Sequence, residues 1–108
     1  MTTLELEVPN LNAELFDSML KSGSFTPDDI DGIELHGFAR FEICDEVIYE
    51  MEDEFPEYFC VHVHLKEGGV DGVGDFSDLT KAQEYAQRLA CKYGWRVDCY
   101  LRPVGAEL

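Results

Sequence analysis

Positive charge is what this sequence has least of. Eight Lys and Arg residues stand against 23 Asp and Glu residues, and the formal net charge over 108 residues is −15. A surface so negative repels nucleic-acid phosphates and anionic lipids, so we expect no direct binding to nucleic acid or to a membrane. The deficit is uneven, because residues 1–80 carry 20 acids and 3 bases whereas residues 81–108 carry 3 acids and 5 bases. This charge favours basic protein surfaces or cations as partners.

Signatures of secretion, membrane insertion and cofactor binding are also missing. The sequence has no signal-peptide pattern and no apolar run long enough to span a membrane, and its four cysteines show no C-x-x-C spacing. We therefore expect a cytoplasmic protein with reduced thiols. The glycine-rich segment "GGVDGVG" contains an aspartate and is followed by no Lys-Ser/Thr pair, which favours a hairpin turn over a phosphate-binding loop. We expect no cofactor and no enzymatic activity.

The composition is that of a globular chain, with 45% hydrophobic and 12% aromatic residues, and 108 residues suffice for one hydrophobic core. Alternating apolar residues predict strands at about 4–8, 33–43, 59–65 and 95–101. In the second of these, the odd-numbered residues, Phe41 and Ile43 included, are expected to face the core. Strands and helices do not alternate regularly, so we predict one α+β domain over residues 1–108. Its sheet is mostly antiparallel, with two main helices and a β-β-α-β-like arrangement from Tyr58 to Leu101.

Two segments outside the acidic stretch carry helix signals. A helix capped by Asn10 or Asn12 is expected to end before Gly23. The strongest helix begins at Thr80 with a capping box and ends at Gly94. Its expected inner face consists of Ala82, Tyr85, Ala86, Leu89, Ala90 and Tyr93.

The segment "DEVIYEMEDEFPE" holds seven acids among thirteen residues, 45–57, and no Lys or Arg. Apolar residues from Phe41 to Phe55 follow a 3-4-3-4 spacing that suits a helix, whereas the run from Val47 to Tyr49 prefers a strand. We favour a helix from about residue 45 to residue 54, ended by Pro56, with a strand as the alternative. In that helix four carboxylates stack along one ridge: Glu42, Glu46, Glu50 and Glu54.

Such a ridge is self-repulsive, at about 0.2–0.5 kcal/mol for each pair of like charges four residues apart. A chain selected for stability alone would place Lys or Arg there. The ridge is consistent with a recognition surface for a basic partner, with a solvated face or with a cation site. The expected partner-binding residues are the acids of this stretch and two tyrosines: Glu42, Glu46, Tyr49, Glu50, Glu52, Asp53, Glu54, Glu57 and Tyr58.

In size, acidity and compactness the chain is similar to the small acidic anti-CRISPR and antirestriction proteins of phages and plasmids. The resemblance covers the overall profile and no motif. It implies a non-enzymatic inhibitor that imitates nucleic acid and occupies the basic nucleic-acid-binding surface of a defence complex. An acidic adaptor of a host protein is an alternative function.

The segment "CVHVH" contains the most reactive side chains. Cys60, His62 and His64 project from one face of the predicted strand, with alternate residues about 6.6 Å apart. Thiols and imidazoles are zinc ligands, and His36 would add a ligand from another strand. We favour a polar sheet surface and expect no metal, and keep a small metal-binding or enzymatic domain built on Cys60, His62 and His64 as a further alternative.

Overall fold

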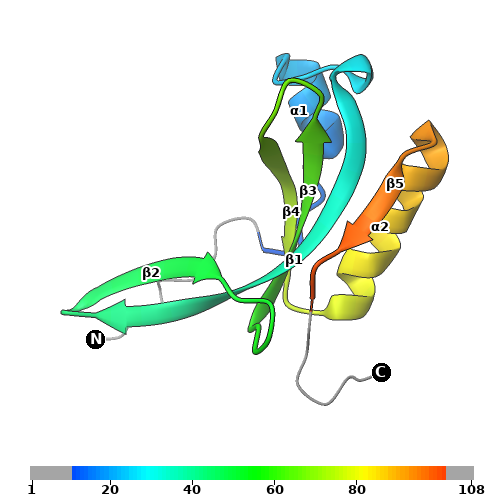
Figure 1. Ribbon diagram of the computed structural model, residues 1–108. Helices are drawn as coiled ribbons and strands as arrows, with labels where there is room; N and C mark the ends of the chain where they lie inside the picture. Colours follow the sequence, from blue (N-terminus) through cyan, green and yellow to red (C-terminus); the bar gives the residue numbers. More distant parts are fainter. Residues whose placement is uncertain (1–10, 102–108) are drawn as a thin grey trace.

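One long strand, β1, organises the fold (Figure 1). The structure, a computed structural model, describes residues 11–101, so the strand predicted at residues 4–8 lies outside the described residues. The described elements confirm the α+β class and the β-β-α-β arrangement at the C-terminal end. In chain order they are α1 (Phe16–Ser22), the 3-10 turn η2 (Pro27–Asp29), β1 (Ile30–Ile43), β2 (Glu46–Met51), β3 (Tyr58–Leu65), β4 (Val70–Phe76), α2 (Leu79–Tyr93) and β5 (Arg96–Cys99).

The sheet is built around β1, which is 14 residues long and pairs with three other strands. Its first half pairs antiparallel with β3 and parallel with β5, and its second half pairs antiparallel with β2. Strand β4 completes the sheet beside β3, again antiparallel. The strand order is therefore β2-β1-β3-β4 with β5 on β1, and the predicted mostly antiparallel sheet is confirmed.

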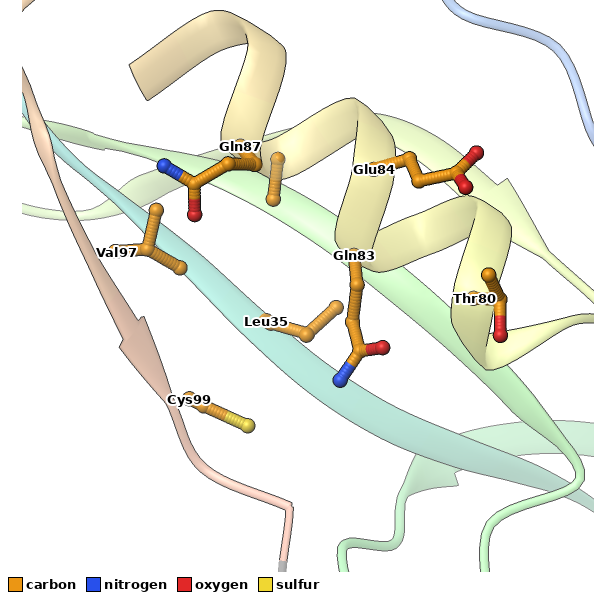
Figure 2. A pocket seen from close by; sticks show the side chains of 8 residues that line it. Leu35, Thr80, Gln83, Glu84, Gln87, Val97 and Cys99 are labelled. Carbon is orange, nitrogen blue, oxygen red and sulfur yellow. The ribbon is translucent and has the colours of Figure 1, made fainter. Parts of the chain in front are cut away.

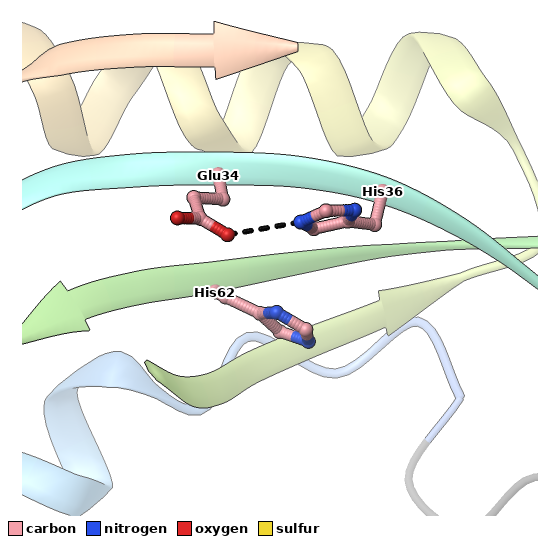
Figure 3. Close-up of side chains that lie close together, drawn as sticks. All are labelled: Glu34, His36 and His62. Carbon is pink, nitrogen blue, oxygen red and sulfur yellow. Dashed lines mark hydrogen bonds and ion pairs between the residues drawn. The ribbon is translucent and has the colours of Figure 1, made fainter. Parts of the chain in front are cut away.

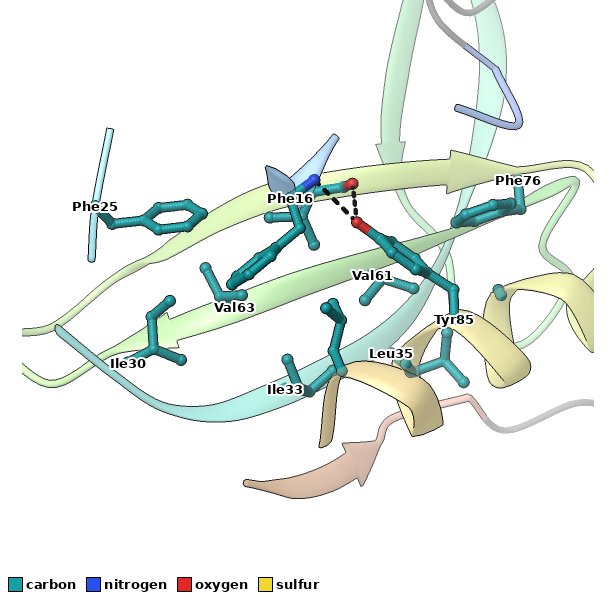
Figure 4. Close-up of a cluster of buried hydrophobic side chains, with 13 residues drawn as sticks. Phe16, Phe25, Ile30, Ile33, Leu35, Val61, Val63, Phe76 and Tyr85 are labelled. Carbon is teal, nitrogen blue, oxygen red and sulfur yellow. Dashed lines mark hydrogen bonds between the residues drawn. The ribbon is translucent and has the colours of Figure 1, made fainter. Parts of the chain in front are cut away.

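Helix α2 covers one face of this sheet and closes the main core (Figure 4). The helix begins after Asp78, whose side chain accepts the backbone N–H of Thr80 at 2.8 Å, so the cap predicted at Thr80 is wrong by two residues. Gly94 ends the helix with a φ of 77°, as predicted. The predicted inner face is confirmed for its five buried members, Ala82, Tyr85, Ala86, Leu89 and Ala90, whereas Tyr93 is half-buried.

The hydroxyl of Tyr85 joins three elements inside this core. It donates a hydrogen bond to the carbonyl of Val73 over 2.9 Å and accepts one from the backbone N–H of Phe16 over 3.1 Å (Figure 4). Phe16 is the first residue of α1, so the helix starts later than the asparagine caps predicted. Asn12 instead has a left-handed φ of 66°, and its side chain accepts the backbone N–H of Ser77 at 3.1 Å.

The helix predicted for residues 45–54 is wrong, because this segment is the strand β2 in a hairpin with β1. The turn consists of Cys44 and Asp45, whose φ values are 51° and 65°. A two-residue hairpin turn of type I′ requires a positive φ at both of its central residues. The β-branched residues Val47 and Ile48 thus follow their strand preference. Glu46 and Glu50 lie on one face of the hairpin about 13 Å apart, with Glu42 on the opposite face, so no ridge exists.

The chain crosses from one side of β1 to the other between β2 and β3. Residues 52–57 make this crossing at Gly37, where β1 has no side chain. Glu52 donates its backbone N–H to the carbonyl of Gly37 at 2.9 Å, and the side chain of Asp53 accepts the Gly37 N–H at 2.8 Å. The crossing fixes where the hairpin leaves the body of the domain.

Candidate functional site

The hairpin formed by β2 and the second half of β1 projects from the domain (Figure 1). We call residues 38–51 the arm. Helix α2 packs on the first half of β1 and leaves the arm uncovered, as Figure 1 shows. The prediction that Phe41 and Ile43 lie in the core is therefore wrong: their exposed fractions are 38% and 55%.

Large apolar side chains are exposed along the arm and the crossing. Phe41 and Ile43 lie on the same face as their cross-strand partners Ile48 and Glu46. Met51 and Phe55 are exposed by 52% and 65%. Exposure of several large apolar side chains on one segment is typical of an interaction surface. Phe41, Ile43 and Met51 are absent from the binding residues expected from the sequence, because their alternation and spacing equally fit a buried position.

The acids of the arm and the crossing have two different roles. Two of these acids accept hydrogen bonds from the backbone. The side chain of Glu52 accepts the backbone N–H groups of residues 54 and 55, and that of Glu57 accepts the backbone N–H of Arg40 at 2.9 Å. Glu42 pairs with Arg40 at 2.8 Å. Four further carboxylates have no ion-pair or hydrogen-bond partner between residues 11 and 101 and remain available to a partner: Asp45, Glu46, Glu50 and Glu54.

The two predicted tyrosines lie at the base of the arm. Tyr58 stacks on Phe38, with 5.1 Å between ring centroids, and Tyr49 meets both rings edge-on. Tyr49 is 37% exposed, whereas Tyr58 is half-buried. These rings therefore stiffen the base of the arm, and Tyr49 also offers contact area to a partner.

A second constellation lies on the sheet face opposite the main core (Figure 3). Glu34 and His36 come from β1 and His62 from β3, where the register sets Glu34 directly opposite His62. One ligand atom from each lies within 4.8 Å of the other two. His36 Nε2 and Glu34 Oε1 are 2.9 Å apart, and the two imidazole centroids are 5.5 Å apart.

Neighbouring groups orient the His36 ring and keep His62 neutral. The ring of Tyr100 stacks on His36 with 4.4 Å between centroids, and Asp53 Oδ2 lies 3.7 Å from His36 Nδ1. Burial and the adjacent His36 lower the pKa of His62, so its imidazole is neutral at pH 7. The Nδ1 atoms of His36 and His62 are both buried without a hydrogen-bond partner among the described residues.

Only two of the four metal candidates from the sequence, His36 and His62, come together. His64 pairs with Asp31 instead, at 2.6 Å between Nδ1 and Oδ1. Cys60 is buried beside Phe38, with an exposed fraction of 4%. Its burial, together with the nearby carboxylates of Asp75 and Asp53, raises the pKa of its thiol to about 12. Glu34 is not among the metal ligands expected from the sequence, although its place two residues before His36 on an alternating strand puts both side chains on one face.

A groove of about 400 Å³ lies between α2 and β5 (Figure 2). Leu35 forms its floor, with Gln83 and Gln87 on the helix side and Val97 and Cys99 on the strand side. It contains none of the site residues predicted from the sequence.

Between residues 11 and 101, no helix is both long enough and apolar enough to cross a membrane. Comparisons of the chain with protein-family models, with curated proteins and with solved structures find no match.

Proposed function

We propose that the protein is a non-enzymatic interaction protein that binds a basic protein surface through its arm. The observation that carries this proposal is the joint exposure of apolar side chains and unpaired carboxylates on one projecting hairpin. Phe41 and Ile43 share one face of the arm with Glu46 and Glu50, and helix α2 does not cover it (Figure 1). Apolar anchors supply buried area, and charges around them supply steering and selectivity.

The partner that fits best is the nucleic-acid-binding surface of a protein or complex. Residues 38–57 contain eight acids and one base, Arg40, which is itself paired with Glu42. A Lys/Arg groove built for phosphates attracts such a segment for the same electrostatic reason. The finer proposal is therefore an inhibitor of the anti-CRISPR or antirestriction type, which competes with nucleic acid for a defence complex. The alternative is an acidic adaptor, which binds its partner without displacing nucleic acid.

The test uses a triple charge reversal, Glu46→Lys, Glu50→Lys and Glu54→Lys. None of these side chains has a partner among the described residues, so the fold is expected to persist. Parent and variant serve as bait in a lysate from a host with a defence system, and any captured protein is purified and its affinity for each measured. We expect the variant to lose binding, and parent binding to weaken steeply between about 50 and 200 mM salt.

The matched control places the same charge change elsewhere, with Asp28→Lys, Glu67→Lys and Glu84→Lys. These exposed acids lie outside the arm and the crossing, so the control separates a local surface from net charge. Retention by the control and loss by the arm variant support the proposal, whereas equal binding of all three chains overturns it. Adding DNA or RNA then decides between the two functions: displacement supports the inhibitor, and a ternary complex supports the adaptor.

A further inference from the structure

We propose that Glu34, His36 and His62 form a binding site for one divalent transition-metal ion of the zinc class. The site is independent of the arm and departs from the expectation of no metal. It lies on the sheet face opposite the main core, where the pairing of β1 with β3 brings the three side chains together (Figure 3).

The distances suit such an ion. The three ligand atoms already lie within 4.8 Å of one another. Zinc bonds of 2.0–2.1 Å in a tetrahedron separate the ligand atoms by about 3.3 Å, so small side-chain rotations close the remaining gap. Strands hold all three ligands, and the register that sets Glu34 opposite His62 is part of a continuous ladder from Gly32 to Phe38.

The donor set selects the class of ion. Two imidazoles with one carboxylate suit zinc and its neighbours among the first-row metals, whereas magnesium and calcium prefer oxygen ligands alone. Three protein ligands leave the fourth position to water. The nearby carboxylates of Asp53 and Asp71 add the negative field that favours a dication at this place.

The surroundings of His36 resemble the outer shell of a metal-bound histidine. With the metal on Nε2, the ring proton resides on Nδ1, which faces Asp53 Oδ2 at 3.7 Å. A carboxylate in this position orients the ring and increases its basicity as a ligand. Tyr100 fixes the ring plane from one side, since the two rings stack within 2° of parallel. The buried Nδ1 of His62, without a partner among the described residues, is a polar atom that an ion would satisfy.

The experiment titrates Zn²⁺ and Co²⁺ into the full chain, purified without a histidine tag and stripped with a chelator. Excess Mg²⁺ is present throughout, so that non-specific binding of Zn²⁺ or Co²⁺ to the acidic surface is suppressed. We expect about one equivalent of bound zinc by elemental analysis, visible Co²⁺ absorption from a four-coordinate site, and a higher melting temperature with metal. Glu34→Gln and His62→Gln are expected to lose the site, with more than about 100-fold weaker affinity.

His64→Gln is the matched control, because His64 lies on the same strand face but pairs with Asp31. It is expected to bind as the parent does. Asp53→Asn tests Asp53 as the residue that positions His36. We expect the variant still to bind one metal ion per chain, with an affinity about 10- to 100-fold lower. The stability of its metal-free form is measured separately. No binding by the folded parent, unchanged binding by both ligand variants, or an equal loss in His64→Gln would each overturn the proposal.

Discussion

The backbone N–H of Glu52 donates a hydrogen bond to the carbonyl oxygen of Gly37 over 2.9 Å, where the chain crosses β1. A Cβ atom on Gly37 would stand 2.5 Å from the carbonyl oxygen of Glu52 and 2.5 Å from Cβ of Pro56. Relief of that clash requires the crossing to move. We expect Gly37→Ala to lower the free energy of unfolding by about 1–3 kcal/mol, measured by urea denaturation.

Gly32→Ala is the control for this prediction. Gly32 also lies on β1 and is buried, but the nearest atoms to its added Cβ are 3.8 Å away, an ordinary contact. Its effect is expected to stay within about 0.5 kcal/mol. Similar losses in the two variants would show that the crossing is not what makes a glycine necessary at position 37.

Tyr85→Phe tests the polar contact inside the core. The substitution keeps the ring but removes the hydroxyl that bridges Phe16 and Val73, and we expect a loss of about 1–3 kcal/mol at pH 7. Burial raises the pKa of Tyr85 to about 12 from its ordinary value of 10.0. Above pH 10 the unfolded chain releases this proton first, so the stabilisation by Tyr85 shrinks as the pH rises from 10 towards 12.

The measurement is the difference in unfolding free energy between parent and Tyr85→Phe, taken from urea curves at several pH values. We expect this difference to be constant up to about pH 9 and then to decrease. A constant difference up to pH 11 would contradict the role assigned to the buried hydroxyl.

Leu89→Ala and Phe41→Ala compare the core with the arm. Leu89 is 8% exposed beneath the sheet, so its truncation is expected to cost about 2–5 kcal/mol. Phe41 is 38% exposed on the arm, and its truncation is expected to cost less than about 1 kcal/mol while weakening partner binding. Thermal unfolding checks both, and a large loss for Phe41→Ala would mean that the arm packs against the body of the domain.

The elements that the sequence predicts well are those whose own hydrophobic period matches a single covered face. In strand β3, buried Val61 and Val63 alternate with half-buried His62 and His64, and α2 has an apolar stripe followed by a terminating glycine. Local periodicity is sufficient in these places because one face is covered along the whole length of the element.

The segment from Glu46 to Met51 fails for two physical reasons. Its apolar spacing fits a helix by coincidence. The turn before it, Cys44 and Asp45, also lacks the glycine that is typical of a two-residue hairpin turn. The sequence also does not predict that Glu34 lies opposite His62, because this depends on the register between β1 and β3 and not on any spacing within a strand.

The turn itself gives the last prediction. Cys44 and Asp45 hold φ values of 51° and 65°, a region that costs most L-residues about 1–2 kcal/mol and that asparagine and glycine enter more easily. Cys44→Asn combined with Asp45→Gly keeps the hairpin and should stabilise the arm by about 1 kcal/mol. Helix α2 leaves the arm uncovered (Figure 1), so we expect the arm to open without the core. The readout is hydrogen exchange of the arm amides, which is expected to slow about fivefold. Cys44→Val, a β-branched residue at the same φ, is the opposing control and should speed exchange. Unchanged exchange in both variants would mean that this turn does not limit the order of the arm.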